Sequence, residues 1–232
     1  MRQHHASPLE AMQKAIDVSE LARIRGVATS LHLPLAAVQA QQLLDYLGLL
    51  QRWNAVHNLS ALQSKEKLLV RLVFDSLTVA TALARYAEGR DIRVLDVGSG
   101  SGFPAAAIAV ARPSWDVAAV DSVSKKAAFI QQAAAESGIA NLRAVGARVE
   151  SLSSTRPFDV IVSKAFGSLR ALVAGTERVL MPGGVWVAQK GKYPAGEIAE
   201  LPSSVEVFHV EPVTVPDLEE DRCLVWLRRR AS

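Results

Sequence analysis

The sequence predicts an α/β fold in which a mostly parallel, seven-stranded sheet carries an N-terminal helical cap. After Gly89, short apolar runs alternate with helix-like segments, which is the pattern of a parallel sheet covered on both faces. The residues before Gly89 instead show helical patterns throughout. We therefore expect a cap at residues 1–88 and a main domain at residues 89–232, packed together as one structural unit.

The cap is predicted to consist of helices. Residues 7–10 (SPLE) form a helix start, with a capping hydroxyl, a proline where no amide donor is needed and a carboxylate three residues after the serine. A second helix starts at Pro34 and has one apolar face at helical spacing. A polar break at 54–60 leads to a third helix at about 65–86. This helix is apolar on most sides, so we expect it to be sandwiched rather than exposed.

The strands of the main domain are predicted from short apolar runs bounded by turn residues or charges. No helical pattern separates the last two of these runs, so we expect them to form an antiparallel pair at the sheet edge. The MPGG segment (181–184) is expected to break a helix and turn it into the following strand. Strands are expected at 92–97, 117–120, 142–145, 160–162, 185–188, 205–210 and 223–228, with helices at 124–137 and 169–180 among them.

Composition narrows the class of protein. Half of the 232 residues are apolar and 21% are charged, which is typical of a globular domain and not of a disordered chain. No apolar run approaches the roughly 20 residues of a membrane span, and the N-terminal residues lack the pattern of a secretory signal. The single cysteine, Cys223, excludes an internal disulfide. We therefore expect a cytoplasmic protein, and a monomer; its net charge of +3 permits an anionic partner without requiring one.

The segment VLDVGSGSGFP (94–104) is the most informative part of the chain. Its glycines, Gly98, Gly100 and Gly102, lie where the first strand passes into a helix, so that a ligand can approach the backbone closely. Asp121 ends the next strand, where a carboxylate commonly accepts hydrogen bonds from the hydroxyls of a ribose. These features predict a cofactor that contains a nucleoside. The alternatives are a tight turn without a ligand and, for Asp121, a solvated carboxylate.

Charge distinguishes the two cofactors that such a loop commonly holds. Asp96 precedes the first glycine and would repel the pyrophosphate of a nicotinamide dinucleotide, whereas it suits the cationic methionine part of S-adenosylmethionine. The spacing also departs from G-x-G-x-x-G, because position 103 is phenylalanine. The sequence therefore favours S-adenosylmethionine as the cofactor.

The loops lack residues that several kinds of methyl acceptor require, so these acceptors are disfavoured. Cys223 lies in an expected edge strand and is a poor candidate for a nucleophile, and residues 163–166 (SKAF) cannot replace the Asn/Asp-Pro-Pro-aromatic turn that holds an exocyclic amine. The five histidines show no ligand spacing, so no metal is expected. A ring nitrogen with an available lone pair needs no proton removed, and we therefore expect no catalytic general base.

Ordered segments of the chain resemble one known family, the bacterial 16S ribosomal RNA guanine-nitrogen-7 methyltransferases, also called the glucose-inhibited division protein B family. The resemblance covers residues 43–228 and implies a class I methyltransferase fold that uses S-adenosylmethionine to methylate ring nitrogen 7 of a guanine in 16S ribosomal RNA. The segments that carry it are WNAVHNLSAL (53–62), RLVFDSL (71–77), LDVGSGSGFP (95–104), AVDSVSKKAAFI (119–130), ARVESL (147–152), FDVIVSKAFGSL (158–169), QKG (189–191) and DRCLVWLRR (221–229).

The resemblance also implies where the cofactor binds. It assigns cofactor contacts to positions matching Gly98, Phe103, Val149, Glu150 and Lys164, in addition to Asp96, Gly100 and Asp121 from the loop analysis. The chain departs from the family pattern where it has Lys164 instead of the frequent arginine, and Leu72 and Cys223 instead of histidines.

Cations near the sheet edge that carries the glycine loop are the expected RNA contacts. Arg71, Lys190 and Arg222 are the candidates, in an enzyme that acts on 16S ribosomal RNA or on the small-subunit particle. For Arg71 the alternative is an ion pair with Asp75 within one helix. Phe166 is either a stacking platform for a flipped base or a core residue. Two other functions stay open: methylation of a small molecule or of another RNA base, and nucleotide binding without catalysis.

Overall fold

The computed structural model describes residues 8–57, 61–62, 64–152 and 156–230. Within them, a seven-stranded sheet has the order β3-β2-β1-β4-β5-β7-β6. Strands β1 to β5 run parallel, and β7 is antiparallel to both β5 and β6, so the predicted antiparallel edge pair is confirmed. The strands are β1 (Arg93–Val97), β2 (Asp116–Asp121), β3 (Leu142–Gly146), β4 (Phe158–Lys164), β5 (Leu180–Lys190), β6 (Val205–Pro212) and β7 (Cys223–Arg229).

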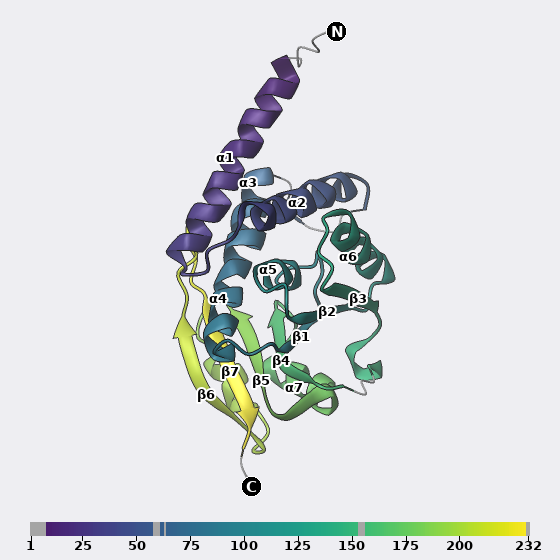
Figure 1. The fold of residues 1–232 in the computed structure, drawn as a ribbon. Coiled ribbons are helices and arrows are strands. Elements are labelled where there is room, and N and C mark those ends of the chain that lie inside the picture. The colour runs from purple at the N-terminus through teal and green to yellow at the C-terminus, as the bar shows by residue number, and fades with distance from the viewer. Residues whose placement is uncertain (1–7, 58–60, 63, 153–155, 231–232) are drawn as a thin grey trace.

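Alternating residues of each central strand pack on opposite faces of this sheet. In β1, Val94 belongs to one core and Leu95 to another, and in β5, Val185 and Trp186 divide in the same way. Figure 1 shows α5 (Ala105–Ala111) and α6 (Ser124–Glu136) on one face and α7 (Leu169–Thr176) on the other. A short helix, α8 (Ala195–Ala199), contacts α7. Both faces are thus covered, as a parallel sheet requires.

The MPGG prediction is wrong in its location. Residues 181–184 lie inside β5, not before it, since Leu180 pairs with Phe158 and Val185 pairs with Val160. The extra residues form a bulge, where Gly183 has a φ of +79°. A side chain at Gly184 would place its Cβ 2.8 Å from the carbonyl oxygen of Asp159. The helix before the strand ends instead in a 3₁₀ turn at Glu177–Val179.

The N-terminal helices are α1 (Pro8–Ser30), α2 (Ala37–His57), α3 (Lys65–Leu68) and α4 (Asp75–Ala87). Helix α2 runs through residues 54–57, so the predicted break begins too early; its remainder, 58–60, and the capping residue Ser7 lie outside the described residues. The third helix is confirmed as nearly continuous, because a π-helical turn at Leu69–Phe74 joins α3 to α4. In the described part, no helix is long and apolar enough to cross a membrane.

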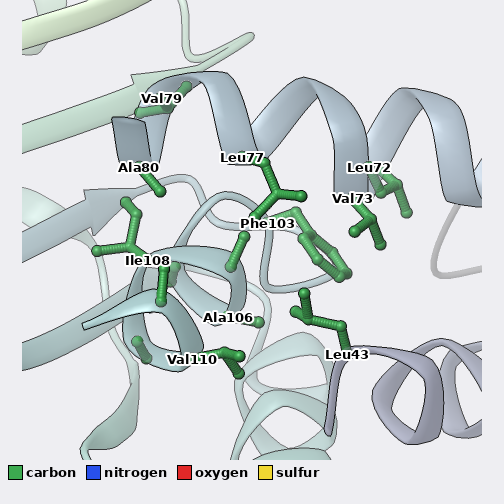
Figure 2. Close-up of a cluster of buried hydrophobic side chains, with 14 of the residues drawn as sticks. Leu43, Leu72, Val73, Leu77, Val79, Ala80, Phe103, Ala106, Ile108 and Val110 are labelled. Carbon is green, nitrogen blue, oxygen red and sulfur yellow. The ribbon is translucent and has the colours of Figure 1, made fainter. Parts of the chain in front are cut away.

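Helix α4 is buried, as its apolar pattern predicts. Leu77 and Ala80 face the α5 side chains in Figure 2, where Leu43 of α2 and Phe103 complete the cluster. Figure 1 shows α1 extending away from the sheet, whereas α2 lies across α5 and α6. The division of the chain into a cap and a main domain stays a prediction.

Tyr46 connects α2 to the glycine-rich loop. Its hydroxyl donates a hydrogen bond to the carbonyl oxygen of Ser101 at 3.0 Å, and its ring packs edge-on against Phe103 and Phe129. Gly102 lies directly beneath it with a φ of +90°, and a Cβ there would come within 2.0 Å of the Tyr46 hydroxyl. The helical region therefore sets the position of the loop.

We expect Gly102→Ala to destabilise the protein more than Gly100→Ala. Both glycines have positive φ, so each substitution adds about 1–3 kcal/mol of backbone strain. At Gly100 the nearest atom to an added Cβ would be 3.9 Å away, so only Gly102→Ala adds a steric conflict with Tyr46. Urea unfolding of both variants without ligand measures the difference. Equal losses would show that Tyr46 does not constrain the loop.

Candidate functional site

A cleft of about 490 Å³ opens at the carboxyl ends of β1, β2 and β4. Strand order reverses here, because β1 has β2 on one side and β4 on the other, and such a switch point is where open α/β sheets bind ligands. The cleft is lined by Val97, Gly98, Val120, Asp121, Ser122, Val123, Lys126, Ala147, Arg148, Val149, Glu150, Ala165 and Phe166.

Gly98 is the glycine of the loop that lines the cleft. The backbone N–H groups of Gly98 and Ser99 both donate to the carbonyl oxygen of Val120, at 2.9 and 3.1 Å. Gly98 has a φ of +69°, and a Cβ on it would lie 2.6 Å from the ring of Phe166. Phe166 therefore lies over Gly98 and lines the cleft, which we name the cofactor cleft after the ligand expected there.

Asp96 is fully buried, and neither Asp96 nor Gly100 lines the cleft. Its Oδ2 accepts a hydrogen bond from the backbone N–H of Ala105 at 3.1 Å, whereas its Oδ1 has no partner among the described residues. Burial raises the pKa of this carboxyl to about 7. A buried acceptor that lacks a donor fits a positively charged ligand such as S-adenosylmethionine, the cofactor that the sequence predicts.

Asp121 joins the loop to the end of β2. Its Oδ2 accepts from the N–H of Gly100 and its Oδ1 from the N–H of Val123, both at 2.9 Å. The carboxylate also lines the cleft, and each of its oxygens has a second lone pair for a ligand hydroxyl. Asp121 thus shapes the loop as well as facing the expected ribose.

Phe103 does not line the cleft with its side chain. The ring is 3% exposed and packs in the core against Tyr46, with ring centroids 5.3 Å apart. The aromatic side chain therefore serves the packing between the loop and α2. A cofactor contact at this position is limited to the backbone.

Val149 and Glu150 begin a 3₁₀ turn after β3 (Val149–Ser151). Val149 is buried, and its carbonyl oxygen accepts from Arg178 at 3.0 Å. The side chain of Glu150 is 63% exposed, and its ion pair with Arg148 is long, at 3.9 Å. Both residues line the cleft, so this turn forms part of its wall.

A second cavity, of about 360 Å³, lies beside the cofactor cleft. Ala165 lines both spaces and has a φ of +60°, a strained conformation for a residue with a side chain. The cavity is lined by Leu62, Arg71, Leu72, Asp75, Lys164, Ala165, Gln189, Lys190, Gly191 and Arg222. It therefore collects all three predicted RNA contacts, and also Lys164, which does not line the cofactor cleft.

Several polar side chains that line the second cavity contact one residue, Asp75. Its side chain is 3% exposed and accepts from Lys164 Nζ at 3.3 Å and from Gln189 Nε2 at 2.5 Å. Lys164 Nζ also donates to the carbonyl oxygen of Arg71 at 2.9 Å. Burial lowers the pKa of the Lys164 amine, and the attraction of Asp75 partly offsets that effect.

Gln189 presents an unused acceptor at the same place. Because the carboxylate of Asp75 can only accept, the amide NH₂ of Gln189 must face it, and this fixes the orientation of the amide. Its Oε1 is buried and has no partner in the described residues. The second cavity therefore combines several donors with one acceptor that a ligand could satisfy.

The predicted cations are all paired. Arg71 bonds to Glu220 and not to Asp75, so the alternative of an ion pair within one helix is wrong. Lys190 Nζ lies 2.8 Å from Glu197 Oε2 and donates to the carbonyl oxygen of Gly167. Arg222 pairs with Glu220 at 3.0 Å. Among the described residues, no group of histidine, cysteine and carboxylate side chains could hold a metal ion.

Sequence reasoning missed the importance of Asp75, Gln189 and Glu220. A signal for Asp75 was present, since a carboxylate in a helix that is apolar on most sides must be buried and therefore needs partners. Gln189 ends an apolar strand, which is a weaker signal of the same kind. Nothing in the sequence distinguishes Glu220 from the acidic residues on either side of it.

We expect Asp96→Asn to stabilise the protein without its cofactor at alkaline pH. The folded pKa, about 7, is above the ordinary value of 3.8, so the folded state binds the proton more tightly than the unfolded state does. The contribution of Asp96 to the free energy of unfolding therefore falls as pH rises from about 4 to 7. Asparagine removes that loss, so the advantage of the variant should grow over this range and level off above it.

The same variant should bind S-adenosylmethionine more weakly, with a larger loss at pH 8 than at pH 6, because wild-type Asp96 is itself mostly protonated at pH 6. Denaturant unfolding and calorimetry at both pH values measure the two effects. Glu150→Gln, at an exposed carboxylate, controls for stability. A variant less stable than the wild type at pH 8 would contradict the assignment of Asp96 as a destabilising charge.

The chain matches the family model described as rRNA small subunit methyltransferase G over residues 39–225. It is 52% identical over 203 residues to the ribosomal RNA small subunit methyltransferase G of Methylibium petroleiphilum, covering 88% of this chain and 91% of that protein. The protein of the same name from Bordetella avium is 42% identical over 214 residues, covering 92% and 95%.

Solved structures show the same fold at low sequence identity. The glycopeptide N-methyltransferase MtfA has a TM-score of 0.56 at 15% identity, over 66% of this chain and 95% of that chain. N-methyltransferase NodS from Bradyrhizobium japonicum, in complex with S-adenosyl-L-homocysteine, has a TM-score of 0.54 at 14% identity, over 78% and 100%. The fold is that of class I S-adenosylmethionine-dependent methyltransferases, and the chain belongs to the rRNA small subunit methyltransferase G family.

Proposed function

We propose that this protein transfers a methyl group from S-adenosylmethionine to ring nitrogen 7 of a guanine in 16S ribosomal RNA. The observation that carries the proposal is the junction of two spaces at Ala165: a cleft lined by Gly98, two residues after the buried carboxylate of Asp96, and a cavity lined by cations. The first suits a cationic cofactor and the second an anionic substrate. We further propose that it works as a monomer in the cytoplasm, with residues 1–88 as the cap that positions the glycine loop.

The cofactor would be held by the cleft residues. Asp96 would face the cationic methionine part, and Gly98 and Gly100, which have no side chains, would let the cofactor approach the backbone closely. Asp121 would accept hydrogen bonds from the ribose, and the turn at 149–150 would flank the adenine. When bound, S-adenosylmethionine supplies an electrophilic methyl group on its sulfonium.

The guanine would enter the second cavity. Its N7 and O6 are both acceptors on one edge, and that edge must be turned toward the methyl donor. The protein is therefore left to recognise the opposite edge, which carries N–H donors. The buried Oε1 of Gln189, which has no partner among the described residues, is an acceptor suited to such a donor.

No side chain is needed as a general base in this reaction. The N7 lone pair is already available, and the product keeps its positive charge. Lys164 is engaged as a donor to Asp75 and to the Arg71 carbonyl oxygen, so it serves as a cationic support rather than as a proton acceptor. The contribution of the protein is alignment, which can supply about 7–11 kcal/mol when the reacting atoms are well oriented.

The proposed function is tested with methyl-labelled S-adenosylmethionine and two substrates, naked 16S ribosomal RNA and small-subunit particles that lack the modification. We expect the label to be in one guanine. Chemistry that cleaves RNA specifically at N7-methylated guanine should then cut the RNA at that position. Heat-denatured enzyme is the control. Label in another base or at another atom would support the alternative RNA-base acceptor, and no label in either RNA would favour a small-molecule acceptor.

We also expect the chemical step to be nearly independent of pH. Because no base must ionise, single-turnover methyl transfer with both substrates saturating should change little from mildly acidic to mildly alkaline pH. The cationic cofactor would keep Asp96 ionised, so its titration should affect affinity and not this rate. A rise of about tenfold or more across this range, abolished by replacing one carboxylate, would mean that the acceptor atom is wrong.

A further inference from the structure

The carboxylate of Glu220 lies between two arginines that come from distant parts of the chain. Arg71 donates from Nη1 to Oε2 at 3.3 Å and from Nη2 to Oε1, so its guanidinium engages both oxygens. Arg222 donates from Nη2 to Oε2 at 3.0 Å. Hydrogen bonds from Arg222 and Arg71 hold the pKa of Glu220 below its usual range. The pair of guanidinium groups thus forms a site for an oxyanion.

A phosphate group suits the same donors. Arginine binds carboxylate and phosphate oxygens through the same planar fork of N–H groups. Both arginines also line the second cavity, beside the junction with the cofactor cleft. A phosphate bound there would belong to the nucleotide whose base enters the cavity, or to one of its neighbours.

The arginine pair touches two carboxylates that differ in their surroundings. Asp75 lies 3.6 Å from Arg222 Nε, and its side chain is 3% exposed and also bonded to Lys164 and Gln189. The side chain of Glu220 is 42% exposed. Asp75 is therefore a fixed part of the site that keeps Arg222 in place, whereas Glu220 can turn toward solvent without breaking the core.

The loop that carries Glu220 is anchored on both sides of it. Val215 is 2% exposed, and Asp217 bonds to Arg23 of α1 at 2.8 Å. On the other side, the carbonyl oxygen of Arg222 accepts from the N–H of Val213 at 2.8 Å, where β7 begins. Displacement of the Glu220 carboxylate therefore requires only a rotation of its side chain.

We propose that Arg71 and Arg222 form a binding site for an RNA phosphate, and that Glu220 occupies this site until the phosphate replaces it. This inference rests on the proposed function, since it takes RNA as the substrate. Glu220 acts as a competitor for the site: in the RNA-free protein its one negative charge offsets part of the positive charge of the arginine pair, which reduces affinity for polyanions that do not place a phosphate there. When the substrate RNA binds, one of its phosphates takes the place of the Glu220 carboxylate on the two arginines.

The test compares Glu220→Gln with Glu219→Gln. Both variants remove one negative charge from the same exposed loop, and in the described part of the chain Glu219 has no ion pair, so long-range electrostatics change equally. Binding of 16S ribosomal RNA is measured as a function of salt. We expect Glu220→Gln to bind about three- to tenfold more tightly than Glu219→Gln at low salt. We also expect its log–log salt dependence to be steeper by about 0.7, because an unneutralised arginine pair releases counterions when it binds a phosphate.

A double-mutant cycle identifies the site. In an Arg71→Gln background, the extra gain from Glu220→Gln should largely disappear, because the carboxylate would no longer compete for the complete pair. Binding of S-adenosylmethionine by each variant, measured by calorimetry, should match the wild type and shows that the fold is intact. Equal RNA binding by Glu220→Gln and Glu219→Gln would overturn the inference and leave the proposed function standing. Salt-independent RNA affinity of the wild type, without methyl transfer, would instead overturn the proposed function.

Discussion

A buried charge must be paired, and the pairing of Asp75 determines how the second cavity of this protein is built. Asp75 is the first residue of α4. Its carboxylate bonds to Lys164 at the end of β4 and to Gln189 near the end of β5. Arg222, just before β7, lies beside it. One side chain from the helical region thus fixes the groups that line the second cavity.

Asp96 shows the opposite arrangement. It is as deeply buried as Asp75, yet one of its oxygens has no partner in the described residues, and burial raises its pKa to about 7. A carboxylate left in this state reduces stability in its ionised form, and a bound cation would compensate for that loss. The two carboxylates therefore differ in their surroundings: Asp75 is paired within the protein, whereas Asp96 keeps one oxygen without a partner in the described residues, which is why we propose it for the cationic cofactor.

Much of the fold could be predicted because its signals are local. The glycines of residues 98–102 require positive φ, the β1 and β5 runs are apolar on both faces, and the missing helix before β7 indicates an antiparallel edge. The bulge at 181–184 was missed because proline and glycine indicate a break in regular structure and not its position relative to a strand. The buried ring of Phe103 was missed because its partner, Tyr46, lies far away in the sequence.

The sequence by itself determined the alternation of strands and helices, the loop between β1 and α5, the acidic residues that suit a cationic cofactor and the ordered segments that indicate the family. Those features depend on residues near one another in the chain. Only the tertiary structure decided which charges meet: Arg71 pairs with Glu220 and not with Asp75, and Lys164 faces the second cavity and not the cofactor cleft. The physical reason is that electrostatic partners are selected by distance in space and by burial, and neither is fixed until the sheet and its helices have packed.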